Sequence, residues 1–116
     1  MNAEFRRGFL KRGWSPEEKI FDELGEPSAK IDYIKDRIGV EVAFSHSSFL
    51  GIEILKFQML SYSFLDRIDV GVYIVVVKDY FKEKFEGSIK FERVVKYLPY
   101  FRSAIQVPIY VYGLEE

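Results

Sequence analysis

The chain has 116 residues, of which 48% are hydrophobic and 30% are charged, as expected for one soluble globular domain with its own core. It has no cysteine, which excludes disulfides and cysteine metal ligands, and its longest internal apolar run, Val72–Val77, is too short to cross a membrane. The net charge of −1 excludes a uniformly basic surface, so any contact with DNA needs a local patch.

The same features predict where the protein works. The start of the chain is charged and lacks the apolar core of a signal peptide, and a chain without cysteine suits a reducing compartment. We therefore expect a cytoplasmic protein. Abundant Lys, Glu, Ile and Tyr favour a thermophilic source.

The first 25 residues predict two helices. Apolar residues spaced among charges over residues 2–11 indicate a short amphipathic helix. Ser15-Pro16-Glu17-Glu18 then has the order of a helix start, with Ser as N-cap, Pro at the first helical position and a carboxylate at N3, so we expect a second helix to about Leu24. The basic residues of the first helix are candidate DNA contacts or, alternatively, a solvated face: Arg6, Arg7, Lys11 and Arg12.

A β-hairpin is predicted next. Lys30–Lys35 and Ile38–Phe44 are rich in β-branched residues and flank the polar pair Asp36-Arg37. If that pair forms a two-residue loop, the numbers of opposed residues sum to 73, which places Asp32 opposite Glu41.

The two facing carboxylates suggest a divalent cation between them or a raised pKa on one of them. In the same register Lys30 faces Ala43 on the same side of the hairpin. A three-residue loop would instead separate Asp32 from Glu41 and leave a solvated hairpin face with scattered charges.

A largely apolar helix is expected over Phe49–Leu65, preceded by the capping segment 45–48. On this helix Glu53 and Lys56 share a face, so they form either an intrahelical ion pair or part of a site. His46, the single histidine, is either a DNA contact or incidental.

The rest of the chain predicts the sheet. Asp69–Val77 reads as a central strand that runs parallel to Ile38–Phe44 through a right-handed crossover. Lys78–Phe85 fits a helix or a loop, and Ile89–Phe101 has near-helical spacing. Gln106–Gly113 is the last strand, with Pro108 at its start or at a sheet edge. We therefore expect an α/β fold: a single-domain three-layer sandwich around a mixed β-sheet, covering residues 1–116.

The hairpin resembles a known nuclease motif. Asp32, eight intervening residues and then Glu41-Val42-Ala43, followed by a helix, resemble the PD-(D/E)XK nuclease core. More narrowly, residues 31–44 are similar to the active-site hairpin of the Bgl II/BstY I type of restriction endonuclease, and the likeness extends through residues 67–72 and 107–109. It implies a restriction-endonuclease-like core over residues 28–116, with residues 1–25 as added N-terminal helices.

The resemblance implies a metal site and a reaction. Asp32 and Glu41 would hold Mg²⁺, with the Val42 carbonyl as a further possible ligand, for hydrolysis of a DNA phosphodiester. It also implies a homodimer, because one metal centre cuts one strand and a duplex needs two cuts. The exposed surface of the N-terminal helices is a candidate interface.

One position departs from the family pattern. A Lys, or a Gln in the Bgl II type, normally stands two residues after the Glu, and this chain has Ala43 there. Three interpretations remain: Lys30 or Lys56 has taken over the missing role, the protein has lost activity and only binds DNA, or the alanine is an engineered inactivating change. A non-nucleic-acid interaction module with a solvated hairpin is the rival outside these classes.

Overall fold

In the computed structural model, five strands form one mixed sheet in the order β1-β2-β3-β4-β5. The structure describes residues 2–19, 30–44, 46–62, 65–78, 80–81 and 84–115, without the side chains of residues 2, 16–19 and 30. In chain order the elements are α1 (Asn2–Lys11), β1 (Ser15–Lys19), β2 (Lys30–Lys35), β3 (Ile38–Val42), the 3-10 turn η1 (Ser47–Phe49), α2 (Leu50–Ser61), β4 (Val70–Val76), α3 (Phe91–Tyr97), the 3-10 turn η2 (Leu98–Phe101) and β5 (Ile109–Leu114).

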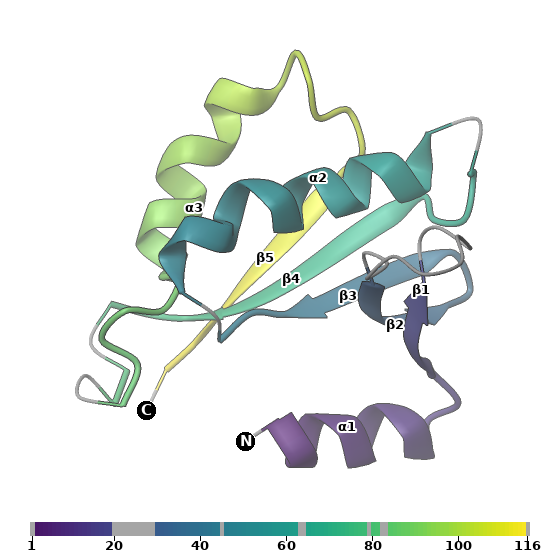
Figure 1. The fold of residues 1–116 in the computed structure, drawn as a ribbon, viewed down its shortest axis with the longest axis horizontal. Helices are drawn as coiled ribbons and strands as arrows, with labels where there is room; N and C mark the ends of the chain where they lie inside the picture. The colour runs from purple at the N-terminus through teal and green to yellow at the C-terminus, as the bar shows by residue number, and fades with distance from the viewer. Residues whose placement is uncertain are drawn as a thin grey trace, which may run out of the picture.

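The sheet is covered on both faces, which gives the predicted three-layer α/β sandwich (Figure 1). Helix α1 lies on one face, where Phe9 stacks on Tyr33 of β2 at a centroid distance of 4.3 Å. Helices α2 and α3 lie on the other face and bury the main hydrophobic core against Ile31 of β2 and against Tyr73 and Val75 of β4. No helix in the described part of the chain is long and apolar enough to span a membrane.

The pairs β1–β2 and β2–β3 are antiparallel, whereas the pairs β3–β4 and β4–β5 are parallel. The predicted parallel pairing of β3 with β4 across the α2 crossover is therefore confirmed. Glycines let α2 approach closely: a Cβ on Gly71 of β4 would lie 2.5 Å from the Phe57 ring of α2.

The predicted second helix is wrong over the residues that the structure describes. Ser15–Lys19 is a strand, paired antiparallel with β2 so that Ser15 lies opposite Ile34. The Ser-Pro-Glu-Glu pattern reflects only the local preference for a helix start. The backbone hydrogen bonds with β2 outweigh that preference. Pro16 is tolerated because β1 ends the sheet order and an edge strand can spare one N–H. Residues 20–24 of that prediction lie outside the described residues.

Three boundaries differ from the predictions for local reasons. Helix α2 ends at Ser61 because Tyr62 takes an extended backbone. Helix α3 passes into the η2 turn at Leu98, next to Pro99, which has no N–H to continue it. The predicted loop alternative holds for the described part of residues 78–85, where successive turns are closed by bonds such as that from the Tyr80 N–H to the Val77 carbonyl. Strand β5 is at the sheet edge, as Pro108 predicted, but it begins at Ile109 and not at the predicted Gln106.

Candidate active site

The hairpin turn sets the register of the site. Asp36 and Arg37 both have positive φ, 51° and 65°, as in the two-residue type I′ turn. Lys35 therefore pairs with Ile38, and the described pairs continue to Tyr33 opposite Val40. Their numbers sum to 73, which confirms the predicted two-residue loop and its register.

Arg37 ties this turn to the loop before β4. Its guanidinium pairs with Asp69 at 2.8 Å and also with the Asp66 carboxylate, while the Asp69 N–H donates to the Arg37 carbonyl at 2.8 Å. These bonds explain how a turn without glycine holds two left-handed residues. They also hold the hairpin beside β4.

Beyond Tyr33, the two carboxylates bond across the hairpin to backbone groups. The Asp32 N–H donates to Glu41 Oε1 at 3.0 Å, and the Val42 N–H donates to Asp32 Oδ2 at 2.8 Å. Each carboxylate is thus held by the backbone of the opposite strand. Asp32 and Glu41 thus lie close together, as predicted, although the described residue pairs of β2 and β3 end at Tyr33 and Val40, before the predicted opposed pair.

Lys56 reaches the same place from α2. Its ammonium lies 3.0 Å from Glu41 Oε2, and the two side chains are 15% and 4% exposed. Helix α2 packs its apolar face on the sheet, and that packing sets Lys56 over β3. Glu41 therefore has a backbone amide on one oxygen and an ammonium on the other.

The carboxyl group of Glu41 has a strongly raised pKa. Burial in the sheet, reinforced by the negative charge of Asp32, raises the pKa of Glu41 to about 8, although Lys56 acts in the opposite direction. A buried carboxylate that resists ionisation in this way favours a bound cation or a proton. The raised pKa therefore marks Glu41 as a functional candidate.

The donor set fits Mg²⁺. Asp32 and Glu41 have more carboxylate oxygens than the ammonium of Lys56 occupies. Mg²⁺ is commonly held by one or two carboxylates together with waters and substrate phosphate. Across the described ranges no three His, Asp or Glu side chains converge as a metal cage. The protein would thus supply two carboxylates, and the Val42 carbonyl stays a predicted further ligand.

Ala43, the departing position, is only 1% exposed and lies in the apolar core with Leu50 and Ile54 of α2. A long polar side chain there would enter a hydrophobic region, so any group equivalent to the usual Lys or Gln would have to come from another position. The backbone of Lys30 lies in β2, but its side chain is outside the described residues. Of the two predicted substitutes, Lys56 is the one that the structure places at Glu41.

A buried pair next to Glu41 was not predicted. The Tyr73 hydroxyl donates to Glu53 Oε2 at 2.5 Å, and Tyr73 is the residue of β4 that pairs with Glu41. The sequence signal was Glu53 itself, a carboxylate within an apolar helix, which was interpreted only as a possible partner of Lys56.

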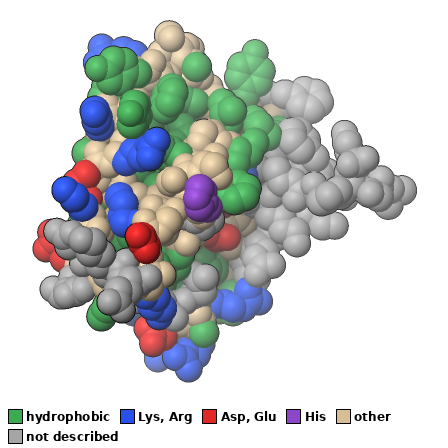
Figure 2. Space-filling view, turned by 60° about the vertical axis from the view of Figure 1, so that its left-hand side comes forward, with side chains coloured by type: hydrophobic (Ala, Val, Ile, Leu, Met, Phe, Trp, Pro, Cys, Tyr) green, Lys and Arg blue, Asp and Glu red, His purple; other side chains and the backbone are tan. Residues whose placement is uncertain are grey.

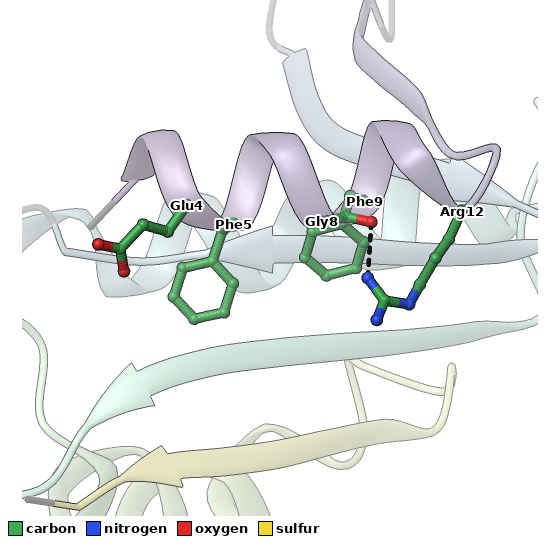
Figure 3. A pocket seen from close by; sticks show the side chains of 5 residues that line it. All are labelled: Glu4, Phe5, Gly8, Phe9 and Arg12. Atoms are coloured by element: carbon green, nitrogen blue, oxygen red, sulfur yellow. Dashed lines mark hydrogen bonds between the residues drawn. The ribbon is translucent and has the colours of Figure 1, made fainter.

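The predicted DNA contacts do not gather at the carboxylates. Arg6, Arg7, Lys11 and Arg12 are exposed on or next to α1, on the face of the sheet opposite α2 (Figure 1). A cavity of about 420 Å³ lies beside this helix, lined by Glu4, Phe5, Gly8, Phe9 and Arg12 (Figure 3). The basic residues of α1 and the two carboxylates could therefore contact the same DNA molecule only if the DNA passed around the edge of the sheet.

His46 lies at the surface (purple in Figure 2) and begins η1. Its Nδ1 accepts the Ser48 N–H at 3.1 Å, so the imidazole acts as the N-cap of this turn. The predicted cap of the long helix is wrong: His46 caps η1, whereas α2 begins at Leu50 with Phe49 as its N-cap and without a side-chain hydrogen bond. A DNA contact through the exposed ring stays a prediction.

Comparison with known proteins identifies a family and a similar solved structure. The family model for restriction endonuclease BglII/BglIII matches residues 1–114. The crystal structure of restriction endonuclease BglII complexed with a DNA 16-mer superposes with a TM-score of 0.81 at 21% sequence identity, over 99% of this chain and 53% of that one. The chain thus spans about half the length of that enzyme. No curated protein matches this sequence.

Proposed function

Since the chain belongs to the BglII/BglIII restriction endonuclease family, we propose that it is an Mg²⁺-dependent DNA endonuclease with its active site at Asp32, Glu41 and Lys56. The observation that carries the proposal is the Lys56–Glu41 contact of 3.0 Å beside Asp32. It supplies a basic group where Ala43 cannot.

The three site residues have different roles in the proposed reaction. Asp32 and Glu41 would hold Mg²⁺, which would supply a bound water of lowered pKa and neutralise charge on the phosphate. Lys56 lies within hydrogen-bond reach of Glu41 and thus of a phosphate held there. Its ammonium would orient the attacking water or stabilise negative charge on the phosphorus oxygens. The buried surroundings of Glu41 strengthen these interactions by excluding bulk water.

A duplex cut requires two such sites. We propose a homodimer in which each protomer cuts one strand and the two are related by a two-fold axis. The exposed side of α1 is the proposed interface, and its arginines are proposed to contact either DNA or the second copy. Sedimentation of the free and DNA-bound protein tests this assembly.

Plasmid nicking tests the activity. Supercoiled DNA with Mg²⁺ or Mn²⁺ should be converted to open-circular or linear forms by the wild type, and Asp32→Asn and Glu41→Gln should each abolish this conversion. Glu115→Gln, the same chemical change at an exposed position, is the matched control and should cleave normally. Unchanged cleavage in Asp32→Asn or Glu41→Gln would remove that residue from the site.

Metal binding is testable without DNA. Mg²⁺ at one hundred times its dissociation constant should stabilise the wild type by about 2.7 kcal/mol against unfolding, because only the folded chain presents both carboxylates. Asp32→Asn should lose most of this stabilisation, whereas Glu115→Gln should keep it. Equal metal stabilisation in all three proteins would contradict the proposed site.

Ala43 favours one second candidate, a relative that binds DNA without cutting it. In that case gel shifts persist, weaken steeply with salt as phosphate contacts do, and no nicking occurs at any metal concentration. If no DNA association appears even at low ionic strength, both candidates fail.

A further inference from the structure

The ammonium of Lys90 is held by oxygen atoms of the turn that precedes it. Its Nζ donates to the carbonyls of Phe85 and Glu86, the latter at 3.3 Å, and to the carbonyl and hydroxyl of Ser88 at 3.0 and 3.1 Å. These four oxygens, here called the Lys90 cage, belong to residues 85–88, between β4 and α3. A lysine ammonium usually stays in water, so one that folds back onto its own turn indicates a specific role.

The Lys90 cage is partly buried. Phe85 and Ser88 are each 7% exposed, and the Ser88 hydroxyl also donates to the Phe85 carbonyl at 2.8 Å. Burial lowers the pKa of Lys90, while the negative charges of Glu86 and Glu92 act in the opposite direction. Because carbonyl oxygens removed from water are costly without a donor, the ammonium stabilises this turn.

The chemistry of the Lys90 cage suits a monovalent cation. In the described part of the chain, every hydrogen bond of the Lys90 ammonium goes to a neutral oxygen, three from the backbone and one from a hydroxyl. Divalent cations prefer sites that include carboxylates, whereas rings of carbonyl oxygens replace the hydration shell of K⁺. The ammonium carries the same single charge as K⁺ and is tethered to the chain.

The turn that carries the Lys90 cage contacts the segment that leads into α2. The Ser47 N–H donates to the Gly87 carbonyl at 3.0 Å, and His46 forms an antiparallel bridge with Ser88. The contact is close, because a Cβ on Gly87 would lie 3.4 Å from the His46 ring. The position of residues 46 and 47 therefore depends on the shape of the turn.

This contact lies between two elements of the candidate active site. Residues 46–49 follow β3, which carries Glu41, and directly precede α2, which carries Lys56. A parallel bridge from Lys90 to Val76 also ties the turn to the end of β4. The turn thus braces the start of α2 against the sheet.

We propose that the Lys90 ammonium acts as a tethered monovalent cation, which fills the Lys90 cage and so fixes the turn against the start of α2. Lys90 is then a positioning residue for Lys56. This second step rests on the proposed function, because it assigns Lys56 to the active site, whereas the cage itself does not depend on cleavage.

The first test replaces the tethered cation with a free one. Lys90→Ala removes the ammonium and leaves space in the cage. We expect its thermal midpoint to lie below that of the wild type in choline chloride, whose cation is too large for the cage, and to rise in KCl or NH₄Cl of the same ionic strength. The wild type and Lys96→Ala, the same change at an exposed position of α3, should not distinguish the salts. Equal midpoints of Lys90→Ala in all three salts would overturn the proposal.

Lysine NMR on the wild type keeps the test decisive if Lys90→Ala does not fold. The protons of an ammonium held by four oxygens exchange slowly with water, so in ¹⁵N-lysine protein the Lys90 ammonium signal should be visible at neutral pH. The signal of exposed Lys96 should be lost by exchange, and Lys90→Arg assigns the Lys90 signal. An ammonium of Lys90 that exchanges as fast as that of Lys96 would contradict the cage.

Hydrogen exchange of the Ser47 amide measures the bracing of α2 without DNA. In choline chloride this amide should exchange about tenfold faster in Lys90→Ala than in the wild type, because the Gly87 carbonyl that accepts it is no longer held in place. K⁺ should restore the protection, and Lys96→Ala should not change it. Unchanged protection of Ser47 in Lys90→Ala would overturn the link between the cage and α2.

Plasmid nicking relates the cage to the reaction. In choline chloride, Lys90→Ala should reduce the rate at saturating DNA by up to about 100-fold, the usual cost of misplacing a catalytic group by an ångström or so, and K⁺ at constant ionic strength should restore it. Normal nicking by Lys90→Ala would exclude a positioning role for Lys90. If the wild type itself does not nick DNA, the proposed function fails, and the salt dependence and the Ser47 exchange still decide whether the cage braces α2.

Discussion

Lys56 and Glu41 form a largely buried ion pair at 3.0 Å between helix α2 and strand β3, in a chain whose family pattern is broken at Ala43. The pair brings a basic group to the carboxylates from a different element. Because α2 is anchored by its apolar face, the ammonium is held by the packing of the helix as well as by its charge. Helix α2 thus brings an ammonium group to Glu41, in a chain that has an alanine at position 43 of the hairpin segment.

Replacing Lys56 with Met should abolish nicking and destabilise the fold. Breaking a buried ion pair from one side typically costs about 3 kcal/mol or more, because the other charge is left without its partner. We expect that loss above pH 8, where Glu41 must ionise, and a smaller one at pH 6, where it holds a proton. Urea unfolding at both pH values measures the difference. Lys96→Met, at an exposed site, is the control and should change neither stability nor nicking.

The pH dependence of stability should identify Glu41. Its pKa is about 8 in the folded protein against a model value of 4.5, so between these values the folded state holds a proton that the unfolded state has released. By linkage, the stability contributed by this proton is complete below about pH 4.5 and is lost as the pH rises to 8. Glu41→Gln should remove this slope, with a gain over the wild type of at most about 5 kcal/mol above pH 8.

Urea titrations of the wild type and Glu41→Gln at several pH values provide the measurement. The other carboxylates are common to both proteins, so the difference curve isolates Glu41. A flat difference between pH 5 and 8 would mean that Glu41 ionises normally in the folded protein. A difference that disappears when Mg²⁺ is added would support the metal site, because the cation then replaces the proton.

The packing of α2 on β4 gives a matched pair of glycine variants. In Gly71→Ala the new Cβ would lie 2.5 Å from the Phe57 ring, so the helix must shift, and we expect a loss of about 1–3 kcal/mol. Gly51→Ala makes the same change at an exposed position of α2, where the new Cβ would have no atom within 4 Å. It should stabilise the folded protein by about 0.5–1 kcal/mol. Denaturant midpoints compare the two. Equal effects would contradict the close approach of Phe57 to β4.

The sequence was informative where the structure depends on local pattern. Alternating β-branched residues around Asp36-Arg37 predicted the hairpin, its two-residue loop and the meeting of Asp32 with Glu41. The apolar character of α2 and of β4 predicted the crossover and the parallel pairing. Each of these signals lies within a single element or between neighbouring ones.

Contacts between distant elements could not be predicted in the same way. Ser15-Pro16 has the local chemistry of a helix start, yet pairing with β2 makes it a strand. The bonds from Arg37 to Asp69 and from Tyr73 to Glu53 join residues 32 and 20 positions apart. They exist only after the sheet has formed, so no spacing rule along the chain reveals them. The contact of Lys56 with Glu41 also joins distant residues, whereas the side chain of the other candidate, Lys30, lies outside the described residues.

Ala43→Gln distinguishes a relocated basic group from a disabled site. The change restores the residue type that Bgl II-type hairpins have at this position, but Ala43 is 1% exposed and packs with core residues of α2. If Lys56 performs the missing role, the added side chain brings no benefit, and overpacking should cost about 1–3 kcal/mol. We therefore expect lower stability and no increase in nicking by folded protein.

Thermal unfolding and plasmid nicking, run on the same preparation, separate the two effects. A clear gain in nicking would show instead that Ala43 limits cleavage. It would then favour the candidate function in which the protein binds DNA without cutting it.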